Sequence, residues 1–183
     1  MTTQYNEYLI EVKNLGVGYE GNIAFDTIYE NDPYESNSYH AVRVIKDRVS
    51  IANILLKGSG GATGVYDNSF VLLNGTFITR CTNTVYAFSL PHLQLKWSKE
   101  LDVATCFQLF DFEGDVLVHG ECQITRITTE GDIKWEFSAR DIFVNLNGHN
   151  EFEIIDKQIK LVDFENYEYL LDSNGKLISE RLL

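Results

Sequence analysis

Two stretches of this chain share one pattern: Val85-Tyr-Ala-Phe-Ser-Leu-Pro-His-Leu-Gln-Leu-Lys-Trp97 and Ile124-Thr-Arg-Ile-Thr-Thr-Glu-Gly-Asp-Ile-Lys-Trp135. In each, a run of strand character leads through a turn into a second run that ends in Lys-Trp, and the two tryptophans are 38 residues apart. A third copy without the tryptophan is Tyr169–Ile178, where Gly175 matches Gly131. A unit that recurs at such a spacing indicates a repeat architecture.

Along the chain, apolar and polar side chains alternate with a period of two residues. Tyr8, Ile10 and Val12 alternate with residues 9, 11 and 13, and Ile133, Trp135 and Phe137 show the same phase in the second copy. Residues 22–29 and 93–97 also alternate. Successive strand side chains point to opposite faces, so this pattern predicts antiparallel strands packed on one side.

Turn signals separate these runs at short intervals, because Gly and Asn adopt positive φ at little steric cost. The clearest are at residues 31–33, 57–61, 74–75, 113–115, 130–132 and 173–175. No segment has a long amphipathic helical pattern. The sequence therefore predicts one all-β domain, residues 1–183, built as an antiparallel meander of about four repeat-like units. The units expected are residues 7–56, 62–100, 103–138 and 141–183.

The repeated stretches resemble the blades of β-propellers, in particular the pyrroloquinoline-quinone-like type. In that type a strand, a glycine turn and a strand ending in Trp recur, and the Trp packs between neighbouring blades. The resemblance covers about Val85–Trp135 and extends to Tyr169–Ile178, although Pro91-His92 replaces the turn glycine in the first copy. It implies a propeller-like fold without a quinone cofactor. Four blades are the lower limit for closure, so a two-sheet β-sandwich or barrel is the alternative.

The formal charge of −12 is concentrated in the second half of the chain. Residues 101–183 carry 17 acids against 7 bases, while residues 1–100 carry 10 against 8. Nucleic acids and anionic membranes are disfavoured partners, because binding to them depends on Lys and Arg. A basic protein would be attracted. The simpler interpretation is that the acids maintain solubility.

The ends and the cysteines indicate a cytoplasmic protein. Residues 1–8 lack the basic and apolar regions of a signal peptide, and no apolar run approaches the length of a membrane span. Cys81, Cys106 and Cys122 form an odd, widely spaced set without a CxxC pair, which favours reduced thiols.

The motifs with possible chemistry have simpler structural interpretations. Gly16–Gly21 fits GxGxxG and Gly58–Gly64 resembles a phosphate loop, but strand-like residues follow both, so we interpret them as a turn and a loop between units. Asp111–Asp115 is too short for a calcium loop and predicts a hairpin turn with solvated acids. No catalytic, cofactor or metal site is predicted.

The histidine and tryptophan residues also have simple structural interpretations. His119 lies near Asp115, Glu121 and Cys122 in the sequence, yet a strand-end histidine is the simpler interpretation. Trp97 and Trp135 fall on the apolar phase of their strands, which favours core packing over a ligand platform.

One tyrosine-rich, acidic segment around a proline has the composition of a contact loop, with the alternative that its tyrosines fold back onto the protein. The partner-binding residues predicted from it are Tyr29, Glu30, Asp32, Tyr34, Glu35 and Tyr39. We expect a non-catalytic interaction module that binds a basic protein, as immunity proteins and other inhibitors do. The alternatives are a small-ligand or carbohydrate-binding or hydrolytic enzyme that uses a pocket, and a self-associating scaffold.

Overall fold

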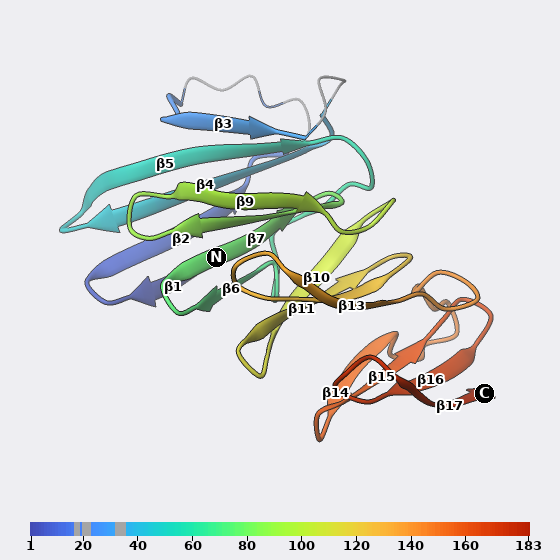
Figure 1. Ribbon diagram of the computed structural model, residues 1–183. Coiled ribbons are helices and arrows are strands. Elements are labelled where there is room, and N and C mark those ends of the chain that lie inside the picture. Colours follow the sequence, from blue (N-terminus) through green and yellow to red (C-terminus); the bar gives the residue numbers. More distant parts are fainter. Residues whose placement is uncertain (17–18, 20–22, 32–35) are drawn as a thin grey trace.

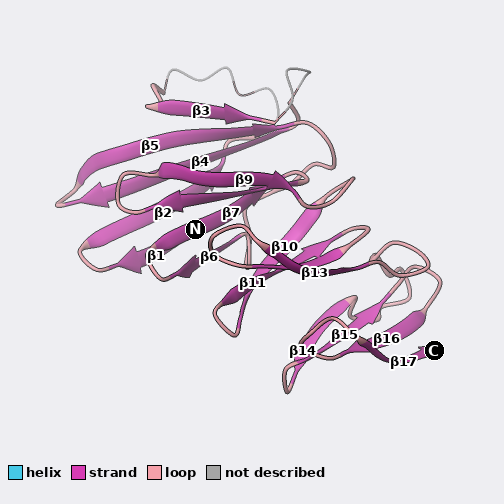
Figure 2. Ribbon diagram, viewed as in Figure 1, coloured by secondary structure: helices cyan, strands magenta, loops and turns pink. Residues whose placement is uncertain are grey.

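The computed structural model describes residues 1–16, 19, 23–31 and 36–183. Every regular element in these residues is a strand (Figure 2). The prediction of an all-β fold is confirmed. The described residues contain no helix long and apolar enough to cross a membrane.

The first sheet, here called sheet A, has five strands in the order β1-β2-β4-β5-β3. Its strands are β1 (Thr2–Tyr5), β2 (Tyr8–Asn14), β3 (Thr27–Glu30), β4 (Ser38–Lys46) and β5 (Val49–Gly58). The other strands of sheet A are antiparallel, but β3 pairs with β5 in parallel at the edge, so this part departs from the predicted antiparallel meander. Residues 23–25, which share the predicted alternation, lie outside β3.

The other three sheets are four-stranded antiparallel meanders. Sheet B contains β6 (Phe70–Leu73), β7 (Thr76–Cys81), β8 (Thr84–Ser89) and β9 (Gln94–Glu100). Sheet C contains β10 (Cys106–Phe112), β11 (Asp115–Gly120), β12 (Ile124–Ile127) and β13 (Ile133–Phe137). Sheet D contains β14 (Phe152–Ile155), β15 (Gln158–Val162), β16 (Tyr167–Leu171) and β17 (Leu177–Leu182).

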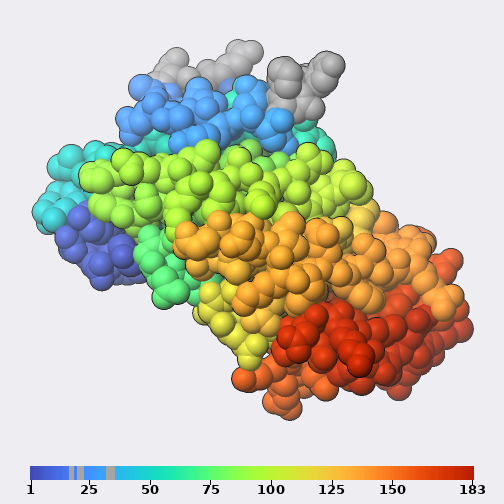
Figure 3. Space-filling model, in the orientation of Figure 1, coloured from blue at the N-terminus to red at the C-terminus, as the bar shows by residue number. Residues whose placement is uncertain are grey.

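The four sheets follow one another through the molecule, with sheet A and sheet D at opposite ends (Figures 1 and 3). The fold is therefore propeller-like, a consecutive row of blade-like sheets. The described residues form four separate sheets, whereas the alternative β-sandwich would have two.

Each pair of neighbouring sheets encloses its own hydrophobic core. The first core joins sheets A and B, the second joins B and C, and the third joins C and D. Sheets B and C are thus covered on both faces, and β7, β8 and β11 are buried along almost their whole length. These strands are packed on two sides, because each lies between two other sheets. The alternation of residues 8–13 does predict one-sided packing correctly in β2, where Ile10 and Val12 are buried and Lys13 is exposed.

The two tryptophans join consecutive sheets. Trp97 of β9 packs against Gly131 in the β12–β13 turn, and its indole nitrogen donates to the carbonyl oxygen of Thr129 at 3.0 Å. Trp135 of β13 packs against Gly175 in the β16–β17 turn in the same way, and its indole nitrogen donates to the Ser173 carbonyl at 3.1 Å. The repeated sequence thus encodes a repeated contact between sheets.

A β-bulge interrupts the predicted alternation in both tryptophan strands. In β9, Trp97 lies opposite Ala87 while Leu95 lies opposite Phe88, so the two apolar residues face different sides. The same shift in β13 separates Trp135 from Ile133, which is exposed. A bulge inserts one residue and changes which face the following side chains occupy.

Candidate functional site

A cleft of about 300 Å³ opens where the edge of sheet A meets the edge of sheet B. We call it the A–B cleft. Its lining residues come from β3 and the residue after it, from β8 and from β9: Tyr29, Glu30, Asn31, Thr84, Tyr86, Ser98, Lys99 and Glu100. Both β3 and β9 are edge strands, so the cleft lies between two strands that each have one unpaired side.

Aromatic rings form the floor of the A–B cleft. The ring of Tyr29 lies 6.4 Å from that of Tyr86 and 5.3 Å from that of Phe88, and the last two rings stack in parallel. Tyr86 is only 3% exposed, and its hydroxyl has no hydrogen-bond partner among the described residues. Burial raises the pKa of Tyr86, so this hydroxyl stays protonated. A buried polar group without a partner is costly to the folded state.

Asn31 holds the end of β3 against sheet B. Its side-chain nitrogen donates to Thr82 Oγ1 at 3.1 Å and to Asn83 Oδ1 at 2.9 Å, and its side-chain oxygen accepts from the Ser59 backbone at 3.1 Å. These bonds span more than 50 residues of sequence from β3 to sheet B. They fix the width of the cleft at this end.

The charged groups of the A–B cleft are two acids and one base. Glu30 forms an ion pair with Lys57 at 2.6 Å and accepts a hydrogen bond from Ser36 at 3.2 Å. Glu100 is exposed and forms no ion pair with any described residue, and Lys99 lies beside it. Lys57 compensates the charge of Glu30, so the carboxylate of the cleft that a basic group of a partner could neutralise is that of Glu100.

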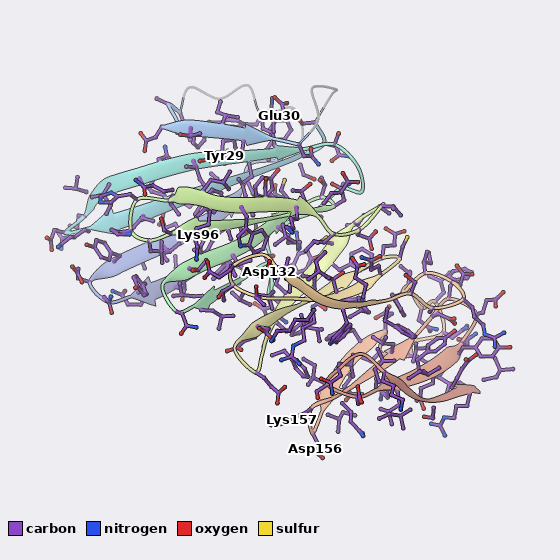
Figure 4. All side chains as sticks on the ribbon, viewed as in Figure 1. Tyr29, Glu30, Lys96, Asp132, Asp156 and Lys157 are labelled. Carbon is purple, nitrogen blue, oxygen red and sulfur yellow. The ribbon has the colours of Figure 1, made fainter. Side chains whose placement is uncertain are left out.

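The structure separates the predicted partner-binding residues into three groups. Tyr29 and Glu30 line the A–B cleft at the upper edge of the molecule (Figure 4). Tyr39 of β4 pairs with Lys57 of β5, whereas Tyr29 of β3 pairs with the next residue along β5, Leu56. The two tyrosines therefore lie on opposite faces of sheet A. The other three predicted residues, Asp32, Tyr34 and Glu35, lie outside the described residues.

Sequence reasoning missed half of the cleft. The sequence analysis places Tyr86 only within the first repeated stretch and Glu100 only at the end of the unit 62–100, because nothing local distinguishes them. Only the packing of sheet A on sheet B brings them to Tyr29. The one signal available was Tyr86 itself, since a tyrosine in an otherwise apolar run needs a partner for its hydroxyl.

The acidic and glycine motifs have structural roles. Asp115, expected in a solvated turn, is instead buried, and its carboxylate contacts Arg126 at 2.7 Å and Lys134 at 2.6 Å. Gly114 has the positive φ of a hairpin turn. Gly16 also has a positive φ, while Gly18 and Gly21 of the same motif lie outside the described residues.

His119 does not meet the acids that neighbour it in sequence. Asp115 is held by its two basic partners, whereas His119 stacks on Phe152 of sheet D with ring centroids 4.8 Å apart. Burial lowers the pKa of His119 to about 3, so the ring is neutral. It lines a second cavity, together with residues of β10 and of the segments before β6 and β14.

No family model and no curated protein matches this chain. Among solved structures, BamB from Moraxella catarrhalis is similar over 100% of this chain and 48% of its own, with 13% identity and a TM-score of 0.45. A protein of unknown function from Bacteroides caccae is similar over 78% of this chain and 54% of its own, with 12% identity and a TM-score of 0.43. The chain spans about half the length of each. TM-scores this low carry no argument about function.

Proposed function

We propose that this protein is a non-catalytic interaction module that binds a basic protein, with one arginine or lysine side chain of the partner entering the A–B cleft. The observation that carries the proposal is the pairing of aromatic rings with carboxylates in one cleft. Tyr29 offers a partly exposed ring, and Glu100 offers an exposed carboxylate that forms no ion pair with a described residue. A cation over a tyrosine ring is attracted by the ring's quadrupole, and a nearby carboxylate adds to that attraction.

The charge of the whole molecule supports the same partner. Of the seven bases in residues 101–183, all except Lys176 form ion pairs with acids. The remaining acids in this half therefore give the surface its negative field. Such a field accelerates association with a basic protein and weakens as salt is added. An inhibitor or immunity protein acts in this manner on a basic target, and we propose that role within the cytoplasm.

The test is affinity capture with charge-reversed variants. Glu100→Lys reverses one carboxylate of the cleft, and Asp156→Lys makes the same change at the exposed β14–β15 turn, far from the cleft (Figure 4). We expect the wild-type protein and Asp156→Lys to capture the same basic protein from a native lysate at low salt. Glu100→Lys and Tyr29→Ala should capture at least tenfold less of it.

Two results would contradict the proposal. The first is that Glu100→Lys and Asp156→Lys change the amount of captured partner equally. The cleft would then contribute no more to binding than any other part of the surface. The other is the absence of any basic protein among those captured at low salt. Unfolding midpoints of the variants separate lost binding from lost folding.

We also infer that the sheets are blades of the pyrroloquinoline-quinone-like type. The support is the contact of Trp97 with Gly131 and of Trp135 with Gly175, each between consecutive sheets. This inference concerns the packing of the blades and implies no cofactor.

A further inference from the structure

One end of sheet D carries three apolar side chains that lie largely in solvent. Three segments form this end: the connection from β13 to β14 (residues 138–151), the β15–β16 turn (residues 163–166) and the end of β17. Leu146 of the connection is 77% exposed, Phe164 of the turn is 43% exposed, and Leu183 after β17 is 47% exposed. We call these three residues the C–D end patch.

Hydrogen bonds to Asn166 bring the three segments together. Its side-chain oxygen accepts from the side-chain nitrogens of Asn145 at 3.0 Å and Asn147 at 2.8 Å. Its backbone carbonyl accepts from the backbone nitrogen of Leu183 at 3.0 Å. The leucine of the connection lies between the two asparagines in sequence, and the phenylalanine of the turn precedes Asn166 by two residues. The three patch residues therefore surround one residue of the turn.

The connection is a built loop that leaves its leucine in solvent. The buried side chain of Asn145 donates to the carbonyl of Asp163 at 3.1 Å and accepts from the backbone nitrogens of Asn147 at 2.9 Å and His149 at 3.3 Å. No residue of the patch belongs to the third core. Burial of apolar side chains is favourable, so a contiguous patch that a fixed loop leaves exposed is typical of a surface that a partner covers.

The charged side chains around the patch are mainly acids. Glu165 is exposed beside the phenylalanine, and Asp141 and Glu151 are half-buried in the connection. In the part of the chain that the structure describes, none of these three carboxylates forms an ion pair. The two arginines at this end, Arg140 and Arg181, are each already paired with a glutamate. A partner with basic groups around an apolar centre would therefore complement this surface.

This charge decides between the possible occupants. A second copy of the chain would bring the same carboxylates into the contact, where like charges repel. An anionic membrane would be repelled for the same reason.

We infer that the C–D end patch binds an amphipathic basic segment of another protein, with apolar side chains on one face and lysine or arginine at its margins. This inference goes beyond the proposed function and does not depend on it. The patch shares no residue with the A–B cleft, and sheet D lies at the opposite end of the molecule from sheet A (Figure 1).

The probe is a synthetic helical peptide with leucines on one face and lysines on the other. Two comparison peptides replace every leucine by serine or every lysine by glutamate. Binding is followed by NMR on the ¹⁵N-labelled full-length protein. We expect the leucine–lysine peptide to bind about tenfold more tightly than either comparison peptide, and to shift the amide resonances of residues 141–151 and 163–166 most strongly.

Two pairs of surface variants test the location. Leu146→Ser removes an apolar side chain from the patch, and Val49→Ser does so at a position of sheet A that is 62% exposed. Glu165→Lys reverses a charge beside the patch, and Asp156→Lys does so at the opposite end of sheet D. We expect the patch variant of each pair to weaken peptide binding about fivefold, and its control to change binding by less than about twofold.

Several results would overturn the inference. These are equal affinity for the three peptides, no binding of the leucine–lysine peptide, and equal effects of the two variants within a pair. A dimer in sedimentation velocity that Leu146→Ser abolishes would assign the patch to a second copy instead. Binding to neutral phosphatidylcholine vesicles that the same variant abolishes would assign it to a membrane. Unfolding midpoints of the four variants separate lost binding from lost folding.

Discussion

Trp97 of sheet B lies against the backbone of Gly131 in sheet C, so closely that a Cβ atom at Gly131 would be 3.0 Å from Cγ of the indole. Glycine is required at this position for two reasons. The indole occupies the space of a Cβ atom, and the φ of +94° is unfavourable for other residues. Trp135 and Gly175 repeat this relationship between sheets C and D, with the indole closer still.

The first prediction separates these two reasons for glycine. Gly114 has a φ of +81° and nothing within 4 Å of its would-be Cβ, so Gly114→Ala has only the backbone cost, about 1 kcal/mol. Gly175→Ala adds a collision with Trp135 and should cost about 1–3 kcal/mol more. Denaturant unfolding measures both. Equal losses would show that the indole contact is unimportant for stability.

The second prediction concerns the buried carboxylate of Asp115. Its burial opposes ionisation, but hydrogen bonds from Lys134 and Arg126 outweigh that effect and hold its pKa below the usual value. Asp115→Asn leaves Arg126 with only the more distant carboxylate of Glu113, at 3.4 Å, and should lower the free energy of unfolding by about 2–4 kcal/mol. The matched variant Asp156→Asn, at an exposed turn, should change it by less than about 0.5 kcal/mol. Similar effects of the two would contradict the assignment.

The third prediction is a loss of stability in mild acid that depends on His119. The unfolded chain binds a proton at this residue near pH 6.5, whereas the folded protein resists it until about pH 3. The contribution of neutral His119 to the free energy of unfolding is therefore complete above pH 6.5, and it is lost as the pH falls toward 3. Between pH 7 and pH 4.5 it amounts to about 2–3 kcal/mol.

Unfolding of His119→Gln at both pH values measures this contribution. The variant should lose less stability than the wild type between pH 7 and 4.5, although buried His40, whose pKa is also lowered by burial, remains. His92→Gln, at an exposed position, should behave like the wild type. An acid response unchanged in His119→Gln would refute the prediction.

The fourth prediction concerns the three thiols, none of which forms a disulfide. Cys81 and Cys106 are fully buried, and burial raises the pKa of Cys81 to about 12 and that of Cys106 further. Cys122 is partly accessible. A disulfide reagent at pH 8 should therefore label one thiol of the native protein and three after denaturation, and Cys122→Ser should remove the native signal. Labelling of two thiols in the native protein would show that Cys81 or Cys106 becomes accessible because a core opens.

Much of the fold was predictable because its signals are local. The alternation of Tyr8, Ile10 and Val12 predicts β2, and Asn74-Gly75 forms the turn of the β6–β7 hairpin with both φ angles positive. The sequence repeat matches Gly175 with Gly131, and in the structure a tryptophan side chain packs against each of these glycines. By contrast, the bulges of β9 and β13 and the parallel pairing of β3 leave no clear local signal.

Sequence alone predicts strands joined by tight turns, in units that share a strand ending in Lys-Trp or a turn glycine. These properties depend on the backbone period and on residues that adopt positive φ, which act over a few positions. Only the tertiary structure decided that sheets B and C are buried on both faces, that Tyr86 meets Tyr29, and that His119 meets Phe152. The last two contacts join residues 57 and 33 positions apart, and the period of a strand does not say which surface its neighbour will cover.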